Sequence, residues 1–319
     1  MAYQAGDTIL DDEYNAFVNN SSSPFGLNHF AGTGALNYGL GESAVATVNA
    51  GDTINASSWN LLFTGMSTIG AHTGDTLTSR SAVSAGDAIA IKAAVATDLA
   101  TLAASVAAGS PNTSAVTTSG ILQQPASSST WTGSFITEVS ATFANANTMR
   151  YFFNAGGKIR IDPVRTGNGG SDGASGKDGA WDNLYNSVGN LDIASQATSR
   201  SGSGDTTDTD NLSLGFYDLT TSYQTLLQLS DDAYPYTANT IKFEAKLDAS
   251  PGSSTVITIK ISAVDGSGEF TFNDGSADNN AYRNGTHEHR LYSINTTTGG
   301  GLANAYSPSS SATVSNATT

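Results

Sequence analysis

The residues with the clearest chemical potential are the two histidines of the segment His287-Glu288-His289. In a β-strand, residues i and i+2 point to the same side, so the two imidazoles would share one face. Such a pair can bind a transition metal, and a threefold axis would gather six imidazoles. The alternative is a solvated strand beside a turn. We therefore name His287 and His289 as the candidate metal ligands, while expecting neither a resident metal nor a cofactor.

A second set of possible ligands is acidic. Asp205, Asp208, Asp210 and Asn211 could supply oxygen atoms to calcium. Their spacing does not match an EF-hand loop, because the turn glycine and the closing glutamate are missing. A solvated acidic loop is the alternative that this spacing favours.

Some segments match the letters of catalytic motifs, but the residues around them do not fit those motifs. Gly169-Gly170-Ser171-Asp172-Gly173 has the letters of a nucleophile elbow, but a glycine-rich run replaces the strand and helix that must flank the serine. Gly176-Lys177 is followed by Asp178, so it is not a phosphate-binding loop. No segment pairs a glutamate with an aspartate in an aromatic-rich strand, so a carboxylate pair for glycoside hydrolysis would have to be brought together by the fold. The sequence therefore predicts no catalytic residues and no enzyme.

Composition limits the partners. The chain has 319 residues, of which 38% are hydrophobic and only 13% charged, whereas soluble domains carry about 25% charged residues. The absence of cysteine excludes a disulfide scaffold and a thiolate metal site. The net charge of −15 predicts neither a nucleic-acid nor a membrane partner, because both are bound through lysine and arginine.

The start of the sequence has no basic region followed by an apolar one, so we expect no signal peptide. No run of apolar residues is long enough to cross a membrane. We expect the chain to be made and folded in a cytoplasm, although its composition is typical of proteins exposed outside cells.

A repeat marks the N-terminal third. Ala5-Gly6-Asp7-Thr8-Ile9 recurs from Ala50 and, in shorter form, from Ala85. Gly-Asp predicts a turn, and each copy precedes a segment with helical apolar spacing. Ser57-Ser58 is the predicted N-cap of the second helix and Gly70 its predicted end. The two apolar stripes are Trp59, Leu62, Phe63, Met66 and Ile69, then Ile91, Val95, Leu99, Leu102 and Val106.

Aromatic residues near the repeat are the candidate interface. Phe25, Phe30 and Tyr38 lie in a glycine-rich stretch, and Trp59 and Phe63 lie on the second helix. The loop aromatics either dock within the chain or form an arm that contacts a neighbouring subunit. We name all five as interface candidates.

The rest of the chain predicts β-structure. We expect a helical docking domain over residues 1–108, a linker over 109–129, a β-rich domain over 130–304 and a polar tail over 305–319. Apolar residues alternate with polar ones along several segments of the β-rich domain, as in half-buried strands. Strands are predicted near 212–219, 224–229, 240–247, 255–264 and 286–296, and a helix around Trp181. The expected fold is α+β, with small helical modules followed by an antiparallel β-sandwich.

Six segments together give the chain a family resemblance. They are AGDTILDDEYNAF, AGDTINASSWNLLF, MRYFFNAGGKIRI, AWDNLYNSV, LGFYDLTTSYQTLLQL and PYTANTIKFEAKL. With them the chain resembles a family of virion structural proteins of tailed bacteriophages, like those of marine cyanophages, over residues 1 to about 265. The resemblance implies a non-enzymatic virion component made in the host cytoplasm, and it carries over no catalytic residues.

These observations lead to one expectation and its alternatives. We expect an oligomer, with a trimer as our hypothesis, located at the neck, tail or fibres and docking on other virion proteins through residues 1–108. The alternatives are a capsid decoration protein and a tail protein that binds a host receptor or glycan through Tyr234, Tyr236 and Tyr282. A glycan-degrading enzyme is the third possibility.

Overall fold

The computed structural model describes most of the chain, in two compact units. Unit 1 comprises residues 1–117, 146–157 and 295–307, and unit 2 comprises residues 118–145, 158–294 and 308–319. Neither unit is one continuous stretch of chain. The described residues are 11–85, 92–109, 116–119, 121, 126–127, 133–166, 176–268, 270–271, 277–278, 286–296, 306 and 308–317.

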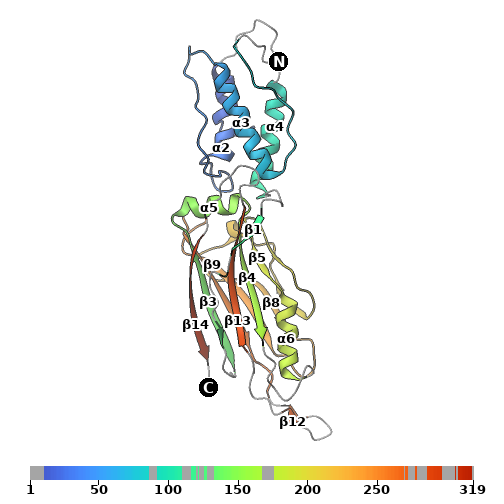
Figure 1. Ribbon diagram of the computed structural model, residues 1–319. Coiled ribbons are helices and arrows are strands. Elements are labelled where there is room, and N and C mark those ends of the chain that lie inside the picture. The colour runs from blue at the N-terminus through green and yellow to red at the C-terminus, as the bar shows by residue number, and fades with distance from the viewer. Residues whose placement is uncertain are drawn as a thin grey trace. The chain divides into compact units, whose positions relative to one another are not determined.

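Unit 1 is helical in its described part. Its helices are α1 (Asp11–Asn19), α2 (Leu27–Ala31), α3 (Ala56–Thr73), α4 (Lys92–Ala107) and α5 (Ala146–Asn154). Figure 1 shows α2, α3 and α4 side by side. The two predicted apolar stripes are buried at every described position, and together with Tyr14 and Val18 of α1 they form the core of the unit. The helical repeat is therefore confirmed as a packed unit.

The second copy of the repeat forms the predicted turn. The N–H of Asp52 donates to the carbonyl of Asn49 (3.0 Å), and the Asp52 carboxylate accepts from the Asn49 side chain (3.0 Å). Gly51 has φ of 89°, which a residue with a side chain rarely adopts. Residues 5–9 and 86–89 of the other copies lie outside the described residues.

Both predicted ends of α3 are wrong. The N-cap is Asn55, whose side chain accepts from the N–H of Ser58 (3.0 Å), so Ser57 and Ser58 lie inside the first turn. Gly70 lies inside the helix, where its carbonyl accepts from Gly74, and Gly74 ends the helix with φ of 81°. An asparagine and a later glycine therefore serve as the caps.

The repeat also appears in a pair of equivalent side-chain contacts. Asn15 donates to the carbonyl of Val48 (2.8 Å) and accepts from its N–H (2.9 Å). Asn60, the matching residue of the next module, does the same with Val83 (3.0 and 2.9 Å). Val48 and Val83 each stand two residues before an Ala-Gly-Asp motif. Each asparagine therefore fixes the segment that leads into the following module.

Helix α5 supplies buried donors to a loop in unit 1. The Arg150 guanidinium donates to the carbonyls of Thr33, Leu36 and Tyr38. The Asn154 amide donates to the Tyr38 and Gly39 carbonyls at 2.8 and 2.9 Å. These bonds connect α5 to the loop around Tyr38. Arg150 itself is only 6% exposed.

Unit 2 contains two six-stranded sheets. One has the order β1-β13-β4-β5-β6, with β2 also pairing β13, and the other has the order β14-β3-β10-β9-β8-β7. The strands of the first sheet are β1 (Val116–Thr118), β2 (Ala126–Ser127), β4 (Lys158–Thr166), β5 (Leu191–Ile193), β6 (Thr198–Arg200) and β13 (Thr286–Thr296). Those of the second are β3 (Ser134–Thr142), β7 (Thr206–Asp210), β8 (Gln224–Ser230), β9 (Thr240–Leu247), β10 (Val256–Val264) and β14 (Ser309–Ala317). Besides these, β11 (Phe270–Thr271) pairs with β12 (Ala277–Asp278).

The two sheets face each other across a common core. The rings of Phe135 on β3 and His289 on β13 lie 4.9 Å apart, which joins one inner face to the other. Helix α6 (Lys177–Val188) buries Trp181, Leu184, Tyr185 and Val188 in the same core. The long strands β3, β4, β13 and β14 lie along similar axes (Figure 1), with β4 antiparallel to β13 and β3 antiparallel to β14, as in an aligned sandwich. The α+β prediction is confirmed.

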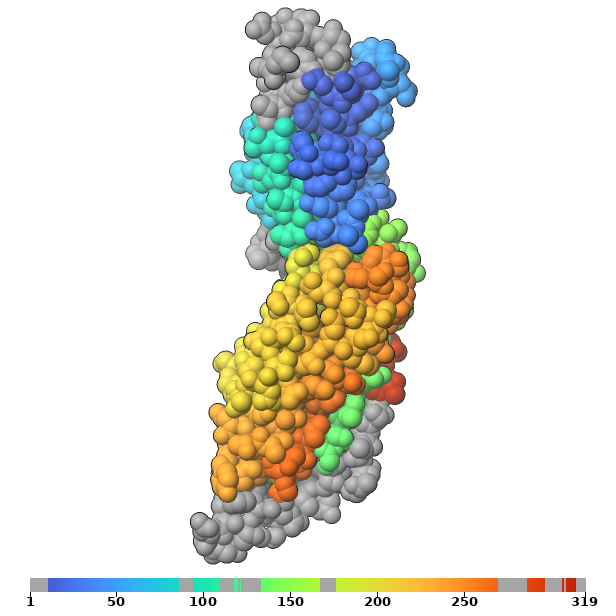
Figure 2. Space-filling view, turned by 180° about the vertical axis from the view of Figure 1, so that it is seen from behind, coloured from blue at the N-terminus to red at the C-terminus, as the bar shows by residue number. Residues whose placement is uncertain are grey.

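The outer face of the second sheet carries an ordered group of side chains. The Tyr223 ring lies 4.3 Å from the Nζ atoms of both Lys246 and Lys260, and its hydroxyl donates to Glu138 (2.7 Å). In Figure 2, the yellow and orange segments that include β8, β9 and β10 make up most of the visible face of unit 2. This face is therefore held by cation–π and ionic contacts between strands.

Three expected boundaries need correction. Part of the predicted linker enters the first sheet as β1 and β2. The predicted polar tail forms β14, which pairs with β3 along nine residues. Residues 212–219 form a turn and a 3₁₀ helix (Phe216–Asp218) rather than a strand. Period-2 patterns are weak in serine-rich segments, so pairing partners rather than local sequence decide these elements.

Candidate functional site

The two candidate histidines lie on the inner face of the sandwich. His287 and His289 share one face of β13, as their spacing predicts, but both are fully buried. Their partners come from β3, β4 and α6. The predicted alternative of a solvated strand is therefore wrong for these positions.

Both ring nitrogens of His289 have hydrogen-bond partners. Nδ1 lies 2.6 Å from the Thr137 hydroxyl and Nε2 lies 3.1 Å from the Tyr185 hydroxyl. Burial lowers the pKa of His289 to about 3, so the ring is neutral at neutral pH. One nitrogen donates and the other accepts, and this leaves no lone pair for a metal.

His287 belongs to a buried group that we call the Arg165 cluster, made of Arg165, Asp178, Asp182 and His287. Arg165 Nε donates to His287 Nε2 (3.2 Å), and its two terminal nitrogens donate to Asp178 Oδ1 (2.7 Å) and Asp182 Oδ1 (2.5 Å). The side chains of Arg165 and Asp178 are each 1% exposed. A metal ion at His287 Nε2 would face the guanidinium, so the metal-ligand hypothesis does not fit this geometry.

A second buried ion pair fixes the start of α6. Lys177 Nζ lies 3.1 Å from Asp265 and donates to the carbonyl of Ser267 (2.6 Å). The two charged side chains are 2% and 7% exposed. Together with the Arg165 cluster, this pair ties the first turns of α6 to β4, β13 and the segment after β10.

A pocket of about 470 Å³ borders the Arg165 cluster. It lies where β5 ends: β5 pairs β4 only over Ile159–Ile161, and the rest of the β4 edge faces the C-terminal half of α6. Asp162 and Asp182 lie on its two walls. Asp182 is bonded to Arg165, and burial raises the pKa of Asp162. Among the described residues, Asp162 is the one carboxyl lining this pocket that forms no ion pair, whereas acid–base hydrolysis uses two.

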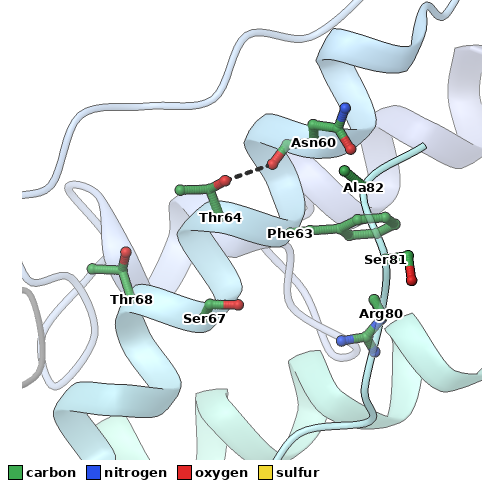
Figure 3. Close-up of a pocket in the computed structure, with 8 residues that line it drawn as sticks. All are labelled: Asn60, Phe63, Thr64, Ser67, Thr68, Arg80, Ser81 and Ala82. Atoms are coloured by element: carbon green, nitrogen blue, oxygen red, sulfur yellow. Dashed lines mark hydrogen bonds between the residues drawn. The ribbon is translucent and has the colours of Figure 1, made fainter. Parts of the chain in front are cut away.

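Unit 1 has a pocket of similar size, about 460 Å³, between α3 and residues 80–82. Figure 3 shows Phe63 on its floor, with hydroxyl groups of Thr64, Ser67 and Thr68 along α3. The Arg80 guanidinium lies 5.6 Å from the centre of the Phe63 ring and pairs with buried Asp98. Because Asp98 already neutralises the cation, the pocket has no feature that selects a charged ligand.

The five interface candidates pack inside unit 1. Trp59, Phe63 and Phe30 are 2%, 8% and 0% exposed. Phe25 stacks on His29 (4.3 Å) and lies 4.7 Å from Tyr38. The loop aromatics therefore dock within the chain, and the hypothesis that they form an arm is corrected.

The predicted acidic ligands are separated in the structure. Asp208 accepts from Gln228 and Ser230 on the neighbouring strand, and Asp210 accepts from the N–H of Leu212. Asn211 donates to the carbonyl of Thr225. Asp205 lies at the end of β7 and has other neighbours, described below.

Sequence reasoning missed the residues that surround the histidines. Arg165 lies an even number of residues from buried Ile159 and Ile161 on β4. Its side chain is therefore expected on the same, inward face of the strand. Asp178 and Asp182 are four residues apart, which places them on one face of α6. The contact between that face and β13 depends on tertiary packing, which these patterns do not specify.

None of the described helices has both the length and the apolar character needed to cross a membrane. No protein-family model, curated protein or solved structure matches the chain.

Proposed function

We propose that this chain is a non-enzymatic structural protein of a tailed-bacteriophage particle. One observation supports the proposal most: the buried cation and imidazole groups around α6 are bonded between elements. Arg165, Lys177 and His289 join α6 to the strands around it. Enzymes instead direct such groups into a space that a substrate can enter.

The proposed location is the neck, tail or fibres, with docking through the helical repeat of unit 1. The family resemblance and the composition support this location. Leu36 and Leu61 are large apolar side chains of unit 1 that are 60% and 58% exposed, and exposed apolar groups are typical of subunit contacts when they cluster. A homotrimer is the proposed oligomer, and capsid decoration is the alternative position on the particle.

The test has two parts. Mass spectrometry of purified particles should detect the chain at constant stoichiometry, and cryo-EM of the same particles should locate it at the neck, tail or fibres. Sedimentation of the purified chain should give an oligomer that Leu61→Asp dissociates without loss of helical signal. A monomer that is absent from particles would contradict the proposal.

Host-glycan binding is a second candidate function, which one observation favours. Tyr234 is 77% exposed in the β8–β9 connection, and exposed aromatic rings can stack on sugar rings. Of the other predicted tyrosines, Tyr236 is buried at 2% exposure and Tyr282 lies outside the described residues. A glycan array with the full chain and Tyr234→Ala separates this function from a purely structural one. Degradation of host envelope material in a zymogram would instead indicate an enzyme.

A further inference from the structure

Three aspartates meet where the ladder between β7 and β8 ends. Asp205 directly precedes β7 and Asp231 directly follows β8, and the ladder pairs Thr206 with Ser230. Continuing this register places Asp205 opposite Asp231. One carboxylate oxygen from each of Asp205, Asp231 and Asp232 lies within 4.8 Å of the others. We call these three residues the aspartate cluster.

The central member of the cluster is buried with an unused oxygen. Asp231 is 2% exposed, and its Oδ1 accepts from the N–H of Ala233 (2.7 Å). Its Oδ2 is inaccessible to solvent and accepts no hydrogen bond from the described part of the chain. The Oδ2 of Asp205 is in the same situation. Two buried carboxylate oxygens of the cluster therefore have no hydrogen-bond donor among the described residues.

Repulsion between the three carboxylates destabilises this arrangement unless a proton or a cation neutralises it. Like charges directly opposite each other on paired strands repel. In the described residues, no lysine or arginine forms an ion pair with the aspartate cluster. Burial, with the nearby charges of Asp205 and Asp232, raises the pKa of Asp231 to about 6. Either a proton or a cation must balance the group.

We propose that Asp205, Asp231 and Asp232 bind a divalent cation, and that the cation is calcium. The three ligands offer only oxygen, the donor that calcium prefers, and no nitrogen or sulfur. Calcium accepts six to eight oxygen ligands in irregular geometry, so carbonyls and water can complete the shell. Magnesium demands a regular octahedron and dehydrates reluctantly, which a site made from two irregular segments suits less well.

The bound cation would join two connections that meet at the end of the β7–β8 ladder. Asp205 ends the connection between β6 and β7, and Asp231 and Asp232 begin the connection between β8 and β9, which carries exposed Tyr234. One contact between the cluster members is a long bond from the Asp232 N–H to Asp205 Oδ1 (3.4 Å). Calcium would therefore order this end of the sheet, whatever the function of the protein.

The experiment uses the full chain, freed of metal with a chelator and then dialysed. Calcium chloride is titrated in by calorimetry, and thermal unfolding is measured with calcium, with magnesium and with chelator. We expect one saturable calcium site per chain and a higher unfolding midpoint with calcium than with magnesium. Asp231→Asn should abolish both effects. Asp208→Asn, which changes an acidic residue of the same strand pair outside the cluster, should leave both unchanged.

A second measurement separates cation binding from charge alone. In chelator, Asp231→Asn should unfold at a higher temperature than the unchanged chain, because the substitution removes the repulsion. If Asp231→Asn fails to fold, Asp232→Asn, whose side chain is exposed, replaces it in both measurements. The proposal is overturned if millimolar calcium neither binds nor raises the midpoint, or if the variant binds calcium as tightly as the unchanged chain. The first result would mean that a proton balances the cluster, and the second would mean that calcium binds elsewhere on the chain.

Discussion

At the scale of single residues, the buried charged side chains of unit 2 connect its helix to the neighbouring strands. Arg165 uses all three guanidinium nitrogens, on His287, Asp178 and Asp182. The net contribution of a buried ion pair to stability is small, because desolvation offsets the attraction. Removing one partner is different, since the charge left behind stays buried without compensation.

Arg165→Met is therefore expected to destabilise unit 2 by about 3–5 kcal/mol, the usual cost of breaking a buried pair. Arg160→Met is the matched control, because Arg160 lies on the outer face of the same strand and pairs with Asp192 at 27% exposure. Its cost should be smaller, because Arg160 and Asp192 are 27% and 12% exposed whereas Arg165 and Asp178 are each 1% exposed. Urea-induced unfolding measures both. Equal costs for the two variants would contradict the structural role assigned to Arg165.

His289 gives unit 2 a dependence on pH. Its pKa is about 3 in the folded chain and about 6.5 when unfolded, so acid protonates the unfolded chain first. The stabilising effect of the neutral ring is complete above pH 6.5 and is lost as the pH falls towards 3. The expected loss is about 1.4 kcal/mol per pH unit within that window.

The variant His289→Gln tests this window, because glutamine can bond to Thr137 and Tyr185 but does not titrate. Unfolding in urea at pH 7, 6, 5 and 4 (roughly one-unit steps across the window) should give a flatter pH dependence for the variant. His72 in unit 1 serves as a comparison, since burial lowers its pKa to about 4. Identical slopes for His289→Gln and the unchanged chain would show that His289 is not neutral and buried.

At the scale of elements, the repeat in unit 1 is held by side chains that imitate backbone pairing. Asn15 and Asn60 each bond to both backbone groups of the valine that precedes the next module. The corresponding position of the third module is Val95, a core residue of α4. This chain of contacts therefore ends with the third module.

Asn60→Ala should cost about 1–3 kcal/mol, because the N–H and the carbonyl of Val83 both lose a partner. Hydrogen exchange provides a local measurement, since the amide of Val83 should lose protection. Thr64→Ala, which removes an exposed hydroxyl bonded within α3, is the control and should change stability by less than about 0.5 kcal/mol. Protection of Val83 that survives Asn60→Ala would exclude this role.

Local sequence predicts the elements with strong periodicity and fails where pairing is remote. The stripe of Val95, Leu99, Leu102 and Val106 predicted α4, and alternation predicted β9 and β10. The serine-rich strand β14 has no such pattern, because its place depends on pairing with β3. The same holds for the site: spacing placed His287 and His289 on one face, but not against Tyr185 and Arg165.

At the scale of the whole molecule, each unit is completed by segments distant in sequence. Unit 1 requires α5, whose Arg150 and Asn154 satisfy the carbonyls of the loop around Tyr38. Unit 2 requires β14, which follows the last segment of unit 1. The predicted domain boundary near residue 108 therefore does not separate two independent folding units.

Residues 1–117 expressed alone should be less stable than the same residues in the full chain. Limited proteolysis should cut first in the loop around Tyr38, which lacks its donors in the fragment. The full chain with Arg150→Ala and Asn154→Ala should show the same cleavage. A fragment as resistant as the full chain would mean that α5 contributes nothing to unit 1.

Pairing between β3 and β14 also affects synthesis. Ser309 bonds to Thr142 across 167 residues of chain, and β10 reaches β3 across 118. Until the ribosome has translated the intervening codons, neither edge of β3 has a partner strand. Ribosomes that follow one another on the same message hold several such nascent strands close together, where identical copies can pair wrongly. Chaperones that shield β3 during elongation should therefore raise the yield of native protein more than those that act after release.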